Sequence, residues 1–256
     1  MIDDKHPLDE AAEQMQAAAE KPVADLAPSP DYWEFKTAED DSVGTFPQAE
    51  PVVEAKRGQP GHQSCVDSFG FPDLPDGLPA QKLKRPAKWT DALSLYVWRD
   101  GYLLNEAALQ VFRQVNLGNY REYPTTVTGG KHDERAYTLV YVDNSIPPEA
   151  LDFERSEFYV QDMISIPIAP IEIDSYEEWL AATKQARNGE LEGGEKFSRI
   201  GYKRLYFRQG QSPNVDLFHL GRLGIRKYIS SRFRRAINES GISGLLIKPN
   251  RRLFNS

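Results

Sequence analysis

Cys65 and His219 are candidates for a nucleophile and its base. A cysteine nucleophile needs a base within hydrogen-bond reach and a positive environment that lowers the pKa of its thiol. Cys65 lies in the Pro- and Gly-rich part of the chain, in the stretch GHQSCVDS, without a predicted helix N-terminus to activate it. His219, in the pattern DLFHL, is typical of the polar side of a half-buried strand. We therefore expect that this protein is not an enzyme.

The remaining histidines, glycine pairs and carboxylates do not form a recognisable metal, phosphate or acid–base site. The histidines are isolated, and His62 with Cys65 offers two metal ligands without a matching second pair. The Gly-Gly pairs at 129–130 and 193–194 lack the following helix and lysine of a phosphate-binding loop. Neighbouring carboxylates such as Asp40 and Asp41 are common on solvated loops. The sequence predicts no metal, no cofactor and no small-molecule substrate.

Charge is distributed unevenly along the 256 residues, whose net charge is −7. Residues 1–56 carry 4 Lys and Arg against 14 Asp and Glu, whereas residues 197–256 carry 13 against 2. A basic C-terminal third, with Arg232, Arg234 and Arg235 on one helix, is compatible with nucleic-acid binding. The same spacing suits the solvated face of an amphipathic helix, and the acidic N-terminal segment would compete for these arginines. Nucleic-acid binding is the alternative hypothesis, and the solvated face is favoured.

Three helices can be located from their start and stop signals. Asn105 is a predicted N-cap for a helix to about residue 115. Ser175 and Glu178 form a capping box for a helix that ends before Gly189. Ser230 or Ser231 caps a third helix, whose apolar positions 233, 236 and 237 share one face and whose stop is Gly241. A short buried strand is expected at 245–247.

The first and third of these helices belong to a repeated pattern. Residues 104–124 and 229–249 align without a gap at an offset of 125 residues, the distance from Leu104 to Ile229. Strands are also predicted at 31–36, 92–98, 119–127, 135–142, 200–207 and 215–220, with a turn at 128–131. Because strands and helices mix without regular alternation, the fold class is α+β, with a mixed, mainly antiparallel sheet, a few packed helices and two similar helix–strand units.

Composition divides the chain into three parts. Residues 1–30 form an acidic segment with no large apolar face to bury, which predicts a frayed or disordered tail. Residues 31–88 are rich in Pro and Gly and are expected to be extended with one strand, and residues 89–256 form the α+β domain. A lone cysteine excludes an internal disulfide, and no window has the roughly 18 apolar residues of a membrane span. Since no secretory leader is recognisable, we expect a cytoplasmic protein without membrane contact.

Three stretches resemble a known family: residues 104–124, residues 137–158 with VDN at 142–144 and LDFERS at 151–156, and residues 216–249. The pattern is similar to immunity-protein family eleven of bacterial polymorphic-toxin systems, formerly a domain of unknown function. The resemblance covers residues 89–249, with an early strand at 32–35. It implies an α+β protein that binds and neutralises a cognate toxin or secretion-system effector. It supplies no catalytic residues and does not address the acidic N-terminus.

An inhibitor of this kind needs a complementary surface, and opposite charge raises the rate of capture. Two acidic surfaces are candidates for contact with a basic toxin such as a nuclease. They contain Asp174, Glu177 and Glu178 in the first case, and Glu190, Glu192 and Glu195 in the second.

Overall fold

The computed structural model describes residues 32–59, 62, 64–66, 70–96, 101–130, 133–224 and 226–255. The acidic segment 1–30 and parts of the predicted elements at 92–98 and 128–131 lie outside the described residues. The described part contains three α-helices, α2 (Glu106–Arg113), α3 (Tyr176–Asn188) and α4 (Ser231–Ser240). Its strands are β1 (Tyr32–Thr37), β2 (Ala49–Pro51), β3 (Gln81–Leu83), β4 (Ala92–Leu93), β5 (Gly101–Leu104), β6 (Tyr120–Gly130), β7 (Asp133–Val142), β8 (Leu151–Gln161), β9 (Pro167–Ile171), β10 (Arg199–Phe207), β11 (Leu217–His219), β12 (Lys227–Ser230), β13 (Leu245–Pro249) and β14 (Leu253–Phe254).

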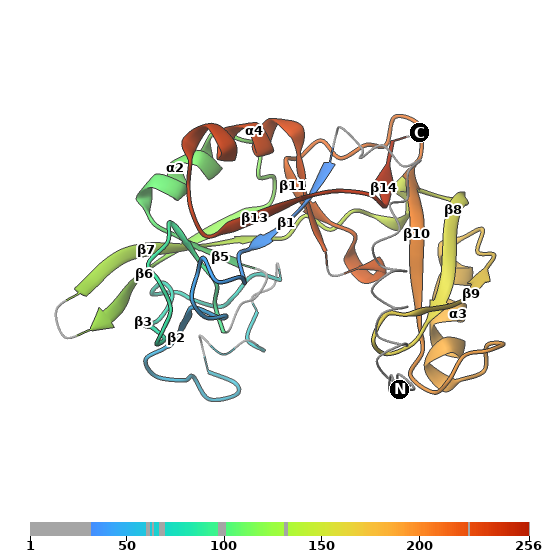
Figure 1. Cartoon of the computed structure of the whole chain (residues 1–256), viewed down its shortest axis with the longest axis horizontal. Coiled ribbons are helices and arrows are strands. Elements are labelled where there is room, and N and C mark those ends of the chain that lie inside the picture. The colour runs from blue at the N-terminus through green and yellow to red at the C-terminus, as the bar shows by residue number, and fades with distance from the viewer. Residues whose placement is uncertain are drawn as a thin grey trace, which may run out of the picture.

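These strands form three sheets, arranged as two lobes joined by a central region (Figure 1). The central sheet has the order β11-β12-β1-β13, and α4 carries the chain from β12 to β13 across β1. A six-stranded sheet of order β2-β3-β6-β7-β5-β4 forms one lobe, and α2 connects β5 to β6 across β7. The other lobe contains the sheet β14-β10-β8-β9 with α3. The strands pair antiparallel except at β3–β6 and β10–β14, which confirms a mixed, mainly antiparallel α+β fold.

The structure confirms the predicted N-caps, because each of the three helices begins directly after one of them. The side chain of Asn105 accepts a hydrogen bond from the amide of Ala108, and Ser230 Oγ accepts one from the amide of Phe233. These bonds satisfy amides that the first helical turn leaves without an intrahelical partner. Gly241 ends α4 in the left-handed region, with φ of 67°, as its position predicted.

Several predicted strands differ from the structure. The segment 31–88 holds the expected strand, β1, and also the short strands β2 and β3. β6 continues to Gly130, where a turn was predicted from 128. β13 is only partly buried, because it lies at the edge of its sheet, so the prediction of a buried strand at 245–247 was wrong.

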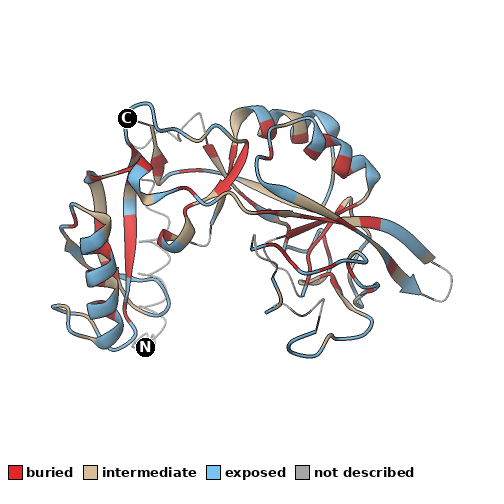
Figure 2. Ribbon diagram, turned by 180° about the vertical axis from the view of Figure 1, so that it is seen from behind, coloured by how far each residue is buried: buried red, intermediate tan, exposed pale blue. Residues whose placement is uncertain are grey.

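Three hydrophobic clusters fill the interior, and buried residues follow the strands (Figure 2). One cluster lies beneath α2 and α4, where the rings of Phe112 and Phe233 meet edge to face with centroids 4.9 Å apart. A second supports the far face of the six-stranded sheet. The third joins the central sheet to the β8–β10 lobe and includes Tyr228 and Trp179 of α3. The lobes therefore share apolar cores with the central region.

Candidate functional site

The three acidic residues predicted at the start of α3 occupy its exposed N-terminal end. Ser175 Oγ accepts a hydrogen bond from the amide of Glu178 at 3.2 Å, which confirms the serine half of the capping box. The carboxylate of Glu178 accepts from the amide of Asp174 at 2.7 Å, one residue before the cap, instead of from the amide of Ser175. Asp174 and Glu177 stay exposed. Carboxylates are favoured here because the N-terminus of a helix carries partial positive charge.

The other three predicted residues lie beyond the opposite end of α3. The helix stops at Gly189, whose φ of 75° suits a residue without Cβ, and the chain turns into the loop containing Glu190, Glu192 and Glu195. All three side chains are exposed. Because α3 has 13 residues, it separates the two acidic groups by about 20 Å. The structure therefore places the six residues on one lobe but in two separate surfaces.

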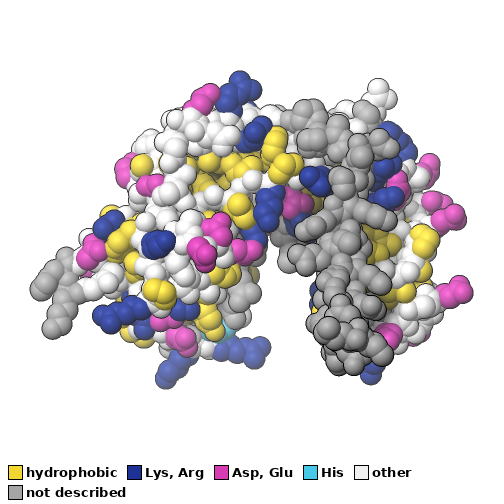
Figure 3. All heavy atoms as spheres, viewed as in Figure 1, with side chains coloured by type: hydrophobic (Ala, Val, Ile, Leu, Met, Phe, Trp, Pro, Cys, Tyr) yellow, Lys and Arg dark blue, Asp and Glu magenta, His cyan; other side chains and the backbone are white. Residues whose placement is uncertain are grey.

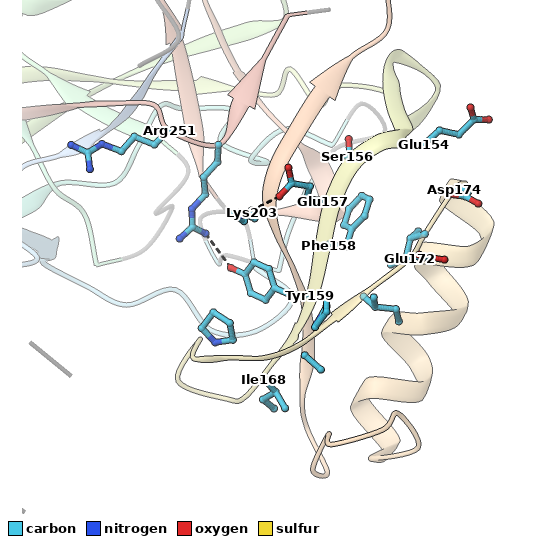
Figure 4. Close-up of a pocket in the computed structure, with 16 residues that line it drawn as sticks. Glu154, Ser156, Glu157, Phe158, Tyr159, Ile168, Glu172, Asp174, Lys203 and Arg251 are labelled. Carbon is cyan, nitrogen blue, oxygen red and sulfur yellow. Dashed lines mark hydrogen bonds and ion pairs between the residues drawn. The ribbon is translucent and has the colours of Figure 1, made fainter. Parts of the chain in front are cut away.

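A groove with a volume of about 1070 Å³ lies against β8 and β9 and includes Asp174 in its wall. Its apolar lining comes from Phe158 on β8 and from residues 167–171 of β9. Asp174 is joined by Glu154 and Glu172 on one side of the β8 ribbon, whereas Lys203 and Arg251 lie on the other (Figure 4). The groove thus has an apolar lining between a negative and a positive margin.

The two margins of the groove differ in how far their charges are already paired. On the basic side, Lys203 Nζ lies 3.2 Å from a carboxylate oxygen of Glu157, and Arg252 donates to the hydroxyl of Tyr159 at 3.4 Å. Among the ion pairs of the described residues, none involves Glu154, Glu172 or Asp174. Acidic side chains also gather along the outer margin of this lobe in the space-filling view (Figure 3). The acidic side of the groove is therefore available to a positively charged partner.

Sequence reasoning identified Asp174 but missed the other groove residues and the apolar loop beside them. Met163, Ile164 and Ile166 are exposed at the turn between β8 and β9, as are Ile168 in β9 and Phe197 before β10. Their types alone suggest core positions, because large aliphatic and aromatic side chains are usually buried. Asp162 offers the one local signal, since an aspartate before a short turn often bonds to the following amides.

Cys65 and His219, the candidates for a nucleophile and its base, make their hydrogen bonds with different parts of the chain. His219 Nδ1 accepts a hydrogen bond from the amide of Gly221 at 3.1 Å, and Nε2 lies 3.4 Å from a carboxylate oxygen of Asp143. Both ring nitrogens therefore have partners within the fold. Cys65 stands in a turn, where its amide donates to the carbonyl of His62 and its carbonyl accepts from the amide of Asp73.

Three arginines of the basic C-terminal third are engaged within the protein. Arg232 forms a fork of hydrogen bonds to the buried carboxylate of Asp216. The guanidinium of Arg234 lies 3.6 Å from the ring centroid of Trp33, a cation–π contact. Arg226, just before β12, pairs with Glu34 on β1. These contacts fasten α4 and the start of β12 within the central region and leave fewer cations for phosphate.

Across the described residues, no group of three or more His, Cys, Asp or Glu side chains is arranged to hold a metal ion. Within the same ranges, no helix is long and apolar enough to cross a membrane. No protein-family model matches the chain, and no curated protein matches it significantly.

Proposed function

We propose that this protein binds a cognate bacterial toxin or effector and neutralises it without catalysis. The observation that carries the proposal is the groove against β8 and β9, which combines an apolar lining with unpaired acidic side chains. Protein interfaces are built in this way, from a desolvated apolar centre and a charged rim. The resemblance of residues 89–249 to immunity-protein family eleven points to the same class of function.

The charge of the lobe favours a basic partner. Glu154, Glu172, Asp174 and Glu177 are exposed around the groove and the start of α3, and Glu190, Glu192 and Glu195 are exposed at its far end. Opposite charge on the toxin would raise the encounter rate, because long-range attraction steers diffusing proteins into register. A nuclease, whose substrate-binding surface is basic, would have such charge. A partner lying along α3 would contact both acidic surfaces.

Genomic context and binding test the proposal together. We expect a toxin gene next to the gene for this protein, and we expect the two purified products to form a stable complex. Co-expression of the protein should protect cells from that toxin, and Cys65→Ala should protect equally well. Absence of binding between the purified partners, or protection lost with Cys65→Ala, would overturn a non-catalytic immunity function.

We also propose that residues 104–124 and 229–249 are equivalent halves of one scaffold, which holds the binding lobe. The sheet orders β4-β5-β7-β6 and β11-β12-β1-β13 correspond, with a helix crossing the third strand in each. Strand register supports the correspondence at the same offset of 125 residues. The matching pairs are Ala92–Leu104 with Leu217–Ile229, Leu104–Thr138 with Ile229–Trp33, and Pro124–Thr138 with Pro249–Trp33.

Two hydrogen-bond networks support the same proposal, because each joins the two units reciprocally. Asp91 accepts from the side chain of Asn105, the cap of α2, and from the amide of Ser243 after α4. Asp216 lies 125 residues after Asp91 in the chain. It accepts from the hydroxyl of Ser230, the cap of α4, and from the amide of Asn116 after α2. Each aspartate thus ties the beginning of one helix to the loop that follows the other.

A further inference from the structure

The most exposed apolar side chains of the α3 lobe gather in two loops, the first of which runs into the start of β9. Ile164 is 76% exposed, Met163 59% and Phe197 52%, and Ile166 and Ile168 are also exposed. Single exposed apolar residues are ordinary, but a group of five in adjoining loops marks an interaction surface. We call these five residues the apolar tip.

The two loops adjoin because the strands that lead into them are paired. Gln161 at the end of β8 pairs with Arg199 at the start of β10, so residues 162–166 and residue 197 both lie just beyond this pair. A Cβ atom added at Gly193 would lie 3.3 Å from Cγ2 of Ile168, which places the acidic loop against β9. The apolar tip and Glu190, Glu192 and Glu195 therefore belong to one end of the lobe.

The turn that carries the isoleucines is pre-formed. The carboxylate of Asp162 accepts hydrogen bonds from the amides of Ile164 and Ile166, at 3.0 and 2.8 Å. The amide of Asp162 donates to the carbonyl of Ile166 at 3.0 Å, which closes the turn. Ser165 and Phe197 adopt positive φ of 72° and 73°, the only residues other than glycine to do so in the described ranges. Such backbone is costly and is concentrated at functional sites.

Pre-formation matters because an ordered loop loses little conformational entropy when it binds. The hydrogen bonds from the amides of Ile164 and Ile166 to the Asp162 carboxylate form an Asx-type turn. This turn keeps both isoleucine side chains exposed although they are apolar. The edge strand β9 adds a second constraint, since Pro167 and Pro170 have no amide to donate to an incoming strand. Side chains, and not strand addition, are therefore the means of contact at this edge.

Charge around the apolar tip distinguishes a protein partner from a membrane. In residues 161–168 and 187–199, the three cations Arg187, Lys196 and Arg199 face the four anions Asp162, Glu190, Glu192 and Glu195, so this end of the lobe has a net negative charge of −1. Stable attachment to an anionic lipid surface requires clustered cations beside the apolar residues. A protein pocket with an apolar floor and a basic border has the matching chemistry.

We infer that the apolar tip is the anchor of the toxin complex and inserts into an apolar pocket on the toxin that is bordered by basic side chains. The inference rests on the proposed function, because the toxin is its partner. Ile164 and Ile166 provide the inserted side chains, Asp162 holds them in place, and Glu190, Glu192 and Glu195 meet the basic border.

The test uses the full chain and the purified product of the adjacent toxin gene, inactivated at its catalytic residue. We expect the double variant Ile164→Ser, Ile166→Ser to bind that product at least about 100-fold more weakly, mostly through faster dissociation. Asp162→Ala should weaken binding about tenfold, because the turn must then be ordered on binding. Val53→Ser is the matched control: Val53 is 74% exposed but lies after β2 in the other lobe.

The outcomes separate the two proposals. If the wild type binds the toxin and the double variant binds it with the same affinity, the apolar tip is not the anchor, and the proposed function still stands. Failure of the wild type to bind overturns both. Two further measurements exclude other partners for the same surface. Co-sedimentation with phosphatidylcholine–phosphatidylglycerol vesicles that is lost in the double variant would identify a membrane surface instead, and a wild-type dimer in sedimentation equilibrium that becomes a monomer in the variant would identify a second copy.

Discussion

Asp216 is the residue on which the packing of the central region depends most directly. The residue is 3% exposed, and its carboxylate accepts from Ser230 Oγ at 2.5 Å, from the amide of Asn116 at 2.7 Å and from the guanidinium of Arg232. A buried carboxylate is tolerable only because these donors replace the water it has lost. One side chain thereby holds Ser230, the cap of α4, pairs with Arg232 and fixes the loop after α2.

We expect Asp216→Ala to lower the free energy of unfolding by about 1–3 kcal/mol, because Ser230, Asn116 and Arg232 lose their shared acceptor. Urea denaturation followed by circular dichroism measures the change. Glu192→Ala is the control, since Glu192 is exposed, and it should alter stability by less than about 0.5 kcal/mol. Equal stability of the two variants would show that the network contributes nothing.

The same carboxylate predicts a pH dependence. Burial pushes the pKa of Asp216 upward, but hydrogen bonds from Arg232, Ser230 and Asn116 outweigh it and leave the pKa below its ordinary value of 3.8. Because the folded pKa is depressed, the stabilisation is complete above the ordinary value and is lost as pH falls through the folded pKa. The stability difference between wild type and Asp216→Asn should therefore shrink below about pH 4. A difference that grows on acidification would contradict this assignment.

At the scale of elements, local signals in the sequence located the helices well and the exposed loops poorly. Asn105, Ser175 and Ser230 were identified as caps because capping depends on neighbouring residues alone. Exposure of Ile164 depends on where β8 and β9 end in space, which no local pattern records. The position of β1 between strands from the other end of the chain was likewise beyond local reasoning, since its partners lie almost 200 residues away.

Helix α2 and helix α4 stabilise each other through Phe112 and Phe233, both fully buried. We expect each Phe→Ala substitution to cost about 3–5 kcal/mol, because the surrounding core cannot close around the cavity. In a double-mutant cycle the two substitutions should show coupling of about 0.5–1.5 kcal/mol, the usual contribution of an edge-to-face pair. Leu180→Ala, on the exposed side of α3, is the control. Strict additivity would show that the helices are supported independently.

At the scale of the molecule, the acidic surfaces act through their field. Reversing Glu190, Glu192 and Glu195 to lysine should slow association with the toxin about tenfold or more at low salt, and the effect should diminish as salt is added. Stopped-flow kinetics measures it. Reversal of Glu54, Asp73 and Asp76, exposed in the other lobe, changes the net charge equally and provides the control. If both triple variants slowed association equally, the effect would come from net charge and not from the position of the acidic surface.

The basic C-terminal third has a separate expectation. Because Arg232, Arg234 and Arg226 already contact Asp216, Trp33 and Glu34, generic DNA or RNA should not shift in a gel with micromolar protein at 150 mM salt. A shift that disappears between 50 and 200 mM salt, and that Arg235→Glu abolishes, would instead support the nucleic-acid alternative.

The place of β1 has a consequence for how the chain is made. Translation delivers residues 32–37 early, but both neighbours of β1, the strands β12 and β13, emerge only after residue 227. The first unit, from β4 to β7, is complete by residue 142 and can fold while β1 still lacks its partners. Until β12 and β13 are made, the backbone of β1 can pair with other exposed strand edges, and its apolar side chains Trp33 and Phe35 remain uncovered. This is a hazard of long-range β pairing during synthesis. A ribosome-bound chain that stops at residue 224 should therefore have a protease-resistant first lobe and a cleavable β1.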